Sequence, residues 1–362
     1  MLSYLALAIL LILLFKGSYP LLLTFEVFQN LYFHYFIIEE LPYNFSNFLL
    51  SLKYLNFQFL PSLFVLFIPS DYESDATPQK FKLAITDTTF FISAGHYFLV
   101  IAFYLLWIIT IAILKNKQIC KFRKIRKFAQ GVYENRIRFG IINECMWFCF
   151  MTFVVFGFWQ FYDLNFPYNW SYANLAVAIL CIILCLMVVV WVVYLSLKFR
   201  GDPENIPKKF KFVAGDESFL PYQMPLRYIR KLLLCLFIFS SMVELQVVAM
   251  IASNFLILAF YLIYRPSKSK FSNWINIFIE LCYIGLELVI MVFVNDYEVT
   301  TDKKLEYGKA MIGFTATALL LITVWMIWQF LLFLYDFKFI RDIVEETKVA
   351  NKVHPEEDNL KL

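Results

Sequence analysis

Four polar residues recur along one apolar stretch in the C-terminal half of the chain. Asn276, Glu280, Tyr283 and Glu287 follow one another at intervals of four, three and four residues. This spacing places the four side chains on one face of an α-helix. An ionisable group inside a membrane helix costs at least ~2.5 kcal/mol, which marks such a face for attention. The face predicts a site that binds a cation, relays protons or lines a water path. The alternative is that its carboxyl groups are protonated or hydrogen-bonded to another helix.

A shorter polar stripe lies near the N-terminus. Glu26, Asn30 and His34 are each four residues apart, so they also share one helix face. This stripe is the second candidate intramembrane site, and contact with another helix is its alternative explanation.

Patterns typical of enzymes and cofactor sites do not occur in the sequence. The histidines share no helix face, and there is no Gly-rich phosphate loop, Gly-x-Ser-x-Gly or Cys-x-x-Cys motif. No histidine or carboxylate completes a metal set beside the cysteine pairs Cys145/Cys149 and Cys181/Cys185. We therefore predict no enzymatic activity, no cofactor and no metal site, and we expect the cysteines to fill apolar helix faces.

A basic cluster follows the apolar run that ends near residue 114. Its lysines and arginines alternate with apolar residues that recur every three or four positions from 119 to 132, as in an amphipathic helix at the membrane interface. At ~1 kcal/mol per basic residue, the cluster would hold anionic lipid headgroups; its alternative role is to fix the topology. Because it abuts a membrane helix, lipid rather than nucleic acid is the expected partner. The candidate lipid contacts are Lys121, Arg123, Lys124, Arg126 and Lys127.

The composition of the chain predicts that the elements carrying these residues are membrane helices. Hydrophobic residues make up 61% of the 362, and the mean hydropathy is +0.67, whereas soluble domains are about 45–50% apolar. One bilayer crossing takes about 20 helical residues. The sequence therefore predicts an all-α, polytopic transmembrane bundle of about nine crossings. Two of them, 1–15 and 21–38, are short or carry polar residues. The other seven cover residues 90–114, 141–161, 172–197, 226–264 (a hairpin of two), 274–294 and 309–335.

Loop charges orient this bundle. The 198–231 loop holds eight basic residues, and the 115–138 and 265–273 loops are also basic. The intervening loops, 162–171 and 295–308, are not. Since basic loops face the cytoplasm, the alternation predicts that the C-terminus lies on the cytoplasmic (or matrix) side.

The same reasoning divides the chain. We predict one transmembrane domain over 1–335, with an outer segment at 39–88 and the basic amphipathic segment at 115–138 on the inner side. A charged tail follows at 336–362. The first fifteen residues could instead be a cleaved signal segment, although no basic residue precedes their apolar core.

Several stretches resemble the membrane-spanning region shared by large ciliate surface proteins, which is itself similar to the transient-receptor-potential-like integral membrane domain of fungi. These stretches are FQNLYFHYF, NFQFLPSLF, DTTFFISAGHYFLV, MPLRYIRKLLLCLFIF and LIYRPSKSKFSNWINIFIELC. The last combines Tyr264-Arg265-Pro266 with a basic loop and an Asn/Glu-bearing helix. Ser93 stands where the family has asparagine. The resemblance spans about residues 20–335 and implies a bundle of some nine helices without an established transport activity.

Two functions follow from these patterns. The first is a multi-pass channel- or transporter-like protein with no identifiable substrate, which would use the face around Glu280. The second is a non-catalytic structural or accessory subunit of a larger membrane complex, such as a ciliate respiratory-chain assembly. The expected location of the protein is the plasma, ciliary or endomembrane system, and the mitochondrial inner membrane is the alternative. Partners would be membrane lipids and either further copies of the chain or a larger complex.

Overall fold

A computed structural model describes residues 19–36, 41–64, 68, 89–116, 119, 122–133, 141–162, 164, 169–198, 222–239, 243–266, 269–296 and 299–353. Every regular element within these ranges is a helix. The predicted crossing at 1–15 lies outside the described residues. The all-α class is thus confirmed for the part of the chain that the structure describes.

Five helices are long and apolar enough to cross a membrane. They coincide with five of the predicted crossings and begin or end within a few residues of the expected positions, except that the last is much longer. This result indicates a membrane-embedded protein. The five are α5 (Phe90–Lys115), α8 (Asn169–Lys198), α11 (Val243–Tyr264), α12 (Lys270–Asn295) and α13 (Thr301–Val353).

The other predicted crossings correspond to shorter helices, so nine crossings are not confirmed. Helices α2 (Tyr19–Phe33) and α10 (Gln223–Ile238) have 15 and 16 residues. At ~1.5 Å per residue they are about 22 and 24 Å long, less than the ~30 Å of a bilayer core. Helix α7 (Ile141–Trp159) has 19 residues. These three helices form the interior of the bundle rather than its apolar exterior.

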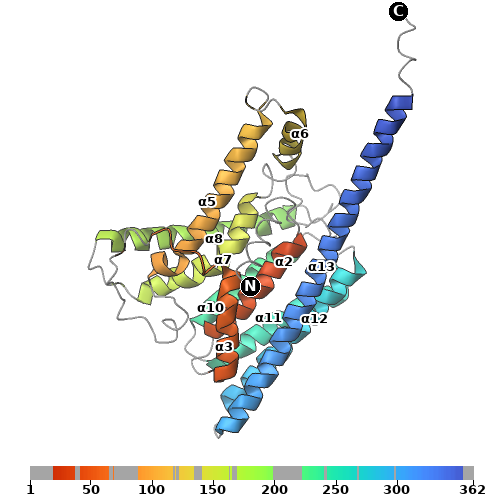
Figure 1. Cartoon of the computed structure of the whole chain (residues 1–362). Coiled ribbons are helices and arrows are strands. Elements are labelled where there is room, and N and C mark those ends of the chain that lie inside the picture. Colours follow the sequence, from red (N-terminus) through yellow and green to blue (C-terminus); the bar gives the residue numbers. More distant parts are fainter. Residues whose placement is uncertain are drawn as a thin grey trace, which may run out of the picture.

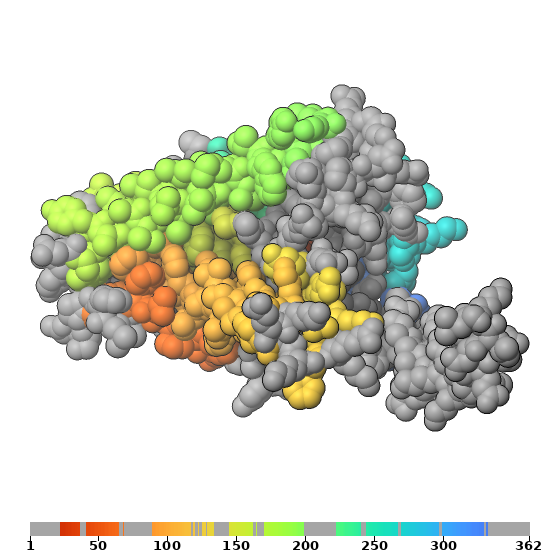
Figure 2. Space-filling model, turned by 90° about the horizontal axis from the view of Figure 1, so that it is seen from above, coloured from red at the N-terminus to blue at the C-terminus, as the bar shows by residue number. Residues whose placement is uncertain are grey.

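Helix α7 is the most enclosed of the three. From Trp147 to Phe156 nearly every side chain is buried, because α8, α10, α5 and α2 surround it. By contrast, α8 exposes a long apolar face that includes Leu180, Val190 and Leu197, and Figure 2 shows this helix along one side of the molecule. Such a face suits contact with lipid.

Helices α12 and α13 form an antiparallel pair on the other side of the bundle (Figure 1). Helix α13 has 53 residues and continues past position 335, where the sequence predicts the end of the last crossing, to Val353. At ~1.5 Å per residue it is about 80 Å long. No glycine or proline occurs from 314 to 353, so no residue type that favours a helix end marks the predicted start of the tail.

The predicted outer segment begins with α3 (Tyr43–Ser51) and the 3₁₀ turn η2 (Leu52–Asn56). Phe45, Leu49 and Leu52 are buried against the bundle, and α3 packs beside α2 and α13. These contacts place the first part of the segment, residues 43–56, on the bundle. The side of the membrane on which it lies stays a prediction.

The basic segment forms α6 (Arg123–Val132), which packs on the end of α5 (Figure 1). Ala129 and Val132 contact Ile111 of α5, while Phe122 and Ile125 remain exposed. Exposed apolar residues beside basic ones fit an interfacial helix.

Candidate functional site

The two predicted polar faces meet in the interior of the bundle, and α10 lies between them. Arg230 and Lys231 of α10 follow Arg227 by three and four residues, which places each of them on the same side of the helix as Arg227. All three are buried, with exposed fractions of 3%, 5% and 0%. Buried cations at this position require negative partners, and α2 and α12 provide them.

Glu26 of α2 is the first partner. Its side chain is fully buried and accepts hydrogen bonds from both arginines. Arg227 Nη1 donates to Oε2 at 2.9 Å, and Arg230 Nη2 donates to Oε1 at 2.5 Å. One carboxylate therefore holds two guanidinium groups through separate oxygens, in the strong charge-assisted class of hydrogen bond.

Glu280 of α12 is the second partner. Arg230 Nη1 donates to both of its carboxylate oxygens, at 2.7 and 2.8 Å. Because Nη2 of the same guanidinium binds Glu26, Arg230 bridges carboxylates from α2 and α12. Glu26, Arg227, Arg230 and Glu280 thus form a charge-balanced group, here named the buried ion network.

Neutral side chains complete the coordination of Arg227. Its Nη2 donates to Asn276 Oδ1 at 3.0 Å and to the hydroxyl of Tyr261, which also accepts from Gln223. Its guanidinium carbon lies 5.5 Å from the centre of the Tyr261 ring. Asn276 in turn donates to the Ser272 carbonyl at 2.8 Å. The network therefore reaches α11 as well, and four helices contribute to it.

Lys231 is the third buried cation on α10. Its ammonium donates to the Trp147 carbonyl at 3.2 Å and lies 3.9 Å from the centre of the indole ring. Among the described residues no carboxylate lies within ion-pair distance of it. A ring face and one carbonyl are thus its direct contacts, while Glu26 of the buried ion network attracts it from beyond ion-pair distance.

A second polar site surrounds Glu287, two turns along α12 from Glu280. Asn254 of α11 donates to Glu287 Oε1 at 2.6 Å, and His34 Nε2 lies 3.6 Å from the same oxygen. His34 Nδ1 lies 2.6 Å from the Asn30 carbonyl, which can only accept. Nδ1 must therefore carry a hydrogen. His34 Nε2 faces the Glu287 carboxyl group from beyond hydrogen-bond distance, so the two side chains lie close together without sharing a hydrogen bond.

Tyr283 connects the two sites. Its hydroxyl lies 3.5 Å from the Val27 carbonyl of α2, and its ring stacks on that of His34 at a centroid separation of 6.2 Å. Glu287 Oε2 has no hydrogen-bond partner within the described part of the chain.

The structure brings together every residue of the two predicted faces, and it adds partners that the sequence analysis did not assign. Arg227, Arg230 and Lys231 were counted among the eight basic residues of a loop at 198–231, and that assignment is wrong. They lie buried in α10, because carboxylates on α2 and α12 neutralise two of them. Five basic residues remain in the loop, which weakens its contribution to the charge alternation. The signal available in the sequence was their three-and-four spacing directly before an apolar run.

The predicted lipid contacts are only partly visible. Lys121 lies outside the described residues, and for Arg123 and Lys124 the structure gives the helix but not the side chains. Arg126 is half-buried and Lys127 is exposed. Across the described ranges, no group of three or more His, Cys, Asp or Glu side chains is arranged to hold a metal ion.

Comparison with known proteins gives no relative: the chain matches no protein family, no curated protein and no solved structure. The class of protein is therefore defined by the fold and the site together: a helical, membrane-embedded protein with a buried Arg–Glu network.

Proposed function

We propose that this chain is a non-catalytic structural or accessory subunit of a membrane assembly, and that its intramembrane charges hold its helices together. The observation that carries the proposal is that Glu280, at the centre of the predicted transport face, is already bound by an arginine of the same chain. Both of its oxygens accept from Arg230, which also binds Glu26. A carboxylate tied in this way is poorly placed to bind a passing cation.

The energetics support a structural role. Breaking a buried ion pair by removing one partner typically costs about 3–5 kcal/mol, because the other charge is left uncompensated. An ion that displaced Arg230 from Glu280 would leave a guanidinium without one of its two carboxylates. Glu280 is only 1% exposed, so water would not compensate for that loss.

The length of α13 supports the role of a subunit. About 20 residues cross a bilayer, whereas α13 has 53. A helix of that length would reach beyond the membrane, and its last part is rich in lysine and glutamate. We infer that this part binds a partner in the aqueous phase.

The test is reconstitution of the purified chain into liposomes, followed by measurement of H⁺, Na⁺ and K⁺ flux, together with the mass of the native assembly after mild solubilisation. The proposal expects flux no greater than in protein-free liposomes, and co-migration of the chain with other subunits in fixed stoichiometry. Cation flux that Glu280→Gln abolishes, while exposed Asp302→Asn leaves it unchanged, would establish transport instead.

Proton transfer is a second candidate function, favoured by the proximity of the buried His34 and Glu287 side chains. A carboxyl and an imidazole 3.6 Å apart, with one carboxyl oxygen lacking a partner in the described part of the chain, form a group that can take up and release a proton. A pH-sensitive dye inside the liposomes tests it. Proton transfer predicts a pH-gradient decay that His34→Gln and Glu287→Gln slow at least tenfold and that Glu306→Gln does not. Equal decay in all of these would exclude it.

A further inference from the structure

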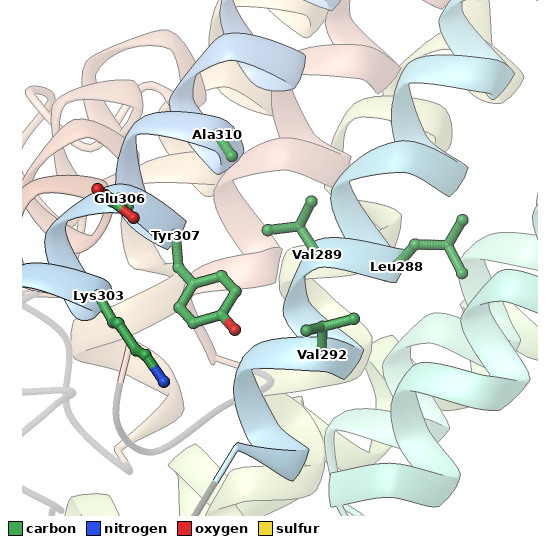
Figure 3. A pocket seen from close by; sticks show the side chains of 7 residues that line it. All are labelled: Leu288, Val289, Val292, Lys303, Glu306, Tyr307 and Ala310. Carbon is green, nitrogen blue, oxygen red and sulfur yellow. The ribbon is translucent and has the colours of Figure 1, made fainter. Parts of the chain in front are cut away.

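A groove opens at the surface where α12 ends and α13 begins. It has a volume of about 480 Å³ and is formed by the last turns of α12 and the first turns of α13 (Figure 3). Sites for small molecules usually measure about 300–1,000 Å³. The lining residues are Leu288, Val289, Val292, Lys303, Glu306, Tyr307 and Ala310.

The lining changes character along the groove. Leu288, Val292 and Ala310 form its apolar part, and the first two are 47% and 55% exposed. Ala310 leaves space that a larger side chain would fill. Lys303 and Glu306 lie nearer the turn between the helices, where the hydrocarbon region gives way to headgroups if the pair crosses a bilayer. The groove is thus apolar at the end away from the turn and charged at the end near the turn, which is here called its mouth.

The charged mouth carries both signs. Lys303 and Glu306 are three residues apart on α13, so they lie on one side of the helix. Lys303 Nζ is 3.8 Å from Asp296 Oδ2, but Lys303 is 54% exposed, and such a pair binds its ammonium only loosely. Tyr307 points toward α12 and donates its hydroxyl hydrogen to the same Asp296 oxygen at 3.1 Å (Figure 3). That bond, together with the edge contact of the ring with Phe293 at a centroid separation of 5.7 Å, holds Tyr307 against α12.

We propose that this groove binds one zwitterionic glycerophospholipid. An acyl chain lies along Leu288, Val292 and Ala310. The phosphate lies at the Lys303 ammonium, and the positive end of the headgroup lies at the Glu306 carboxylate. Charge complementarity selects a zwitterion over an anionic lipid, because Glu306 and Asp296 at the mouth repel an added net negative charge. This site is separate from the basic cluster around α6.

The experiment is native mass spectrometry of the delipidated full chain with added phosphatidylethanolamine or phosphatidylglycerol of identical acyl chains. We expect one phosphatidylethanolamine per chain to bind more tightly than phosphatidylglycerol. Lys303→Gln weakens binding of both lipids about three- to fivefold, as for other exposed charge contacts. Glu306→Gln weakens phosphatidylethanolamine binding but not phosphatidylglycerol binding. Ala310→Phe, which fills the apolar part, removes both.

Lys309→Gln, an exposed position on α13 that does not line the groove, is the matched control and leaves binding unchanged. Equal lipid binding in the wild type and Ala310→Phe would overturn the proposal. Preference for phosphatidylglycerol would overturn it as well. So would a dimer mass that Ala310→Phe abolishes while lipid binding stays constant, since that would assign the groove to a second copy of the chain.

Discussion

At the scale of single residues, the three cations of α10 differ in what compensates them. Arg230 binds two carboxylates and Arg227 binds one, whereas Lys231 faces a ring and a carbonyl. Replacing a buried ion by an apolar group of similar volume is often neutral or stabilising when no charged partner is left behind. Replacing Lys231 should therefore cost much less than removing a carboxylate that binds the two arginines.

We predict that Lys231→Met changes the free energy of unfolding by no more than about 1 kcal/mol in either direction, since no ion pair is broken. Glu26→Gln, by contrast, leaves two guanidinium groups each short of a carboxylate and should destabilise the protein by about 3–5 kcal/mol. Thermal unfolding of the purified protein in detergent measures both. A greater loss in Lys231→Met than in Glu26→Gln would mean that the lysine has a counter-ion.

The residue types at the polar site were predictable, but their partners were not. Periodicity alone placed Asn276, Glu280 and Glu287 on one face, as the structure also has them. Nothing in a single sequence pairs Glu280 with an arginine fifty positions earlier. Such a pairing depends on which helices lie adjacent, and local patterns do not encode that arrangement.

At the scale of elements, hydropathy predicted where the apolar helices lie, but not that three of the shorter ones, α2, α7 and α10, form the interior of the bundle. Hydropathy located α5, α8 and α12 because each has a run of about 20 apolar residues. Helix α10 begins at Gln223, three residues before the predicted start of its crossing, and its three cations were also counted as charges of the preceding loop. Helix α13 continues to Val353 because its charged part still consists of good helix formers.

The packing of α12 on α13 depends on Gly285. A Cβ there would meet the Phe314 ring, whereas a Cβ on Gly313 would meet nothing within 4 Å. We predict that Gly285→Ala destabilises the protein by about 1–3 kcal/mol through overpacking. Gly313→Ala should instead stabilise it by about 0.4–1 kcal/mol, because alanine favours the helix.

Thermal unfolding of these two glycine variants in the same detergent is the measurement. Equal shifts in melting temperature would show that Phe314 moves aside and that α12 and α13 do not need the close approach at Gly285.

At the scale of the whole molecule, α13 links two predicted sides of the membrane. The turn before Thr301 is predicted outside and the C-terminal end inside, although the charge alternation now rests on fewer basic residues. A cysteine placed at Asp302 should react with a membrane-impermeant maleimide from one side of sealed vesicles. One placed at Lys348 should react only from the other. Both variants also carry Cys120→Ser, because Cys120 lies outside the described residues and its native thiol could react with the maleimide. Labelling of both positions from the same side would mean that α13 does not cross.

The central claim, that Arg230 and Glu280 hold helices together rather than serve a transport path, is tested most directly by a double-mutant cycle. Arg230→Met, Glu280→Met and the double variant are compared by thermal unfolding of the purified protein. We predict that each single change costs about 3–5 kcal/mol and that the double variant costs clearly less than their sum, because the broken partner is also removed. Single variants as stable as the wild type, or strictly additive losses, would contradict the account.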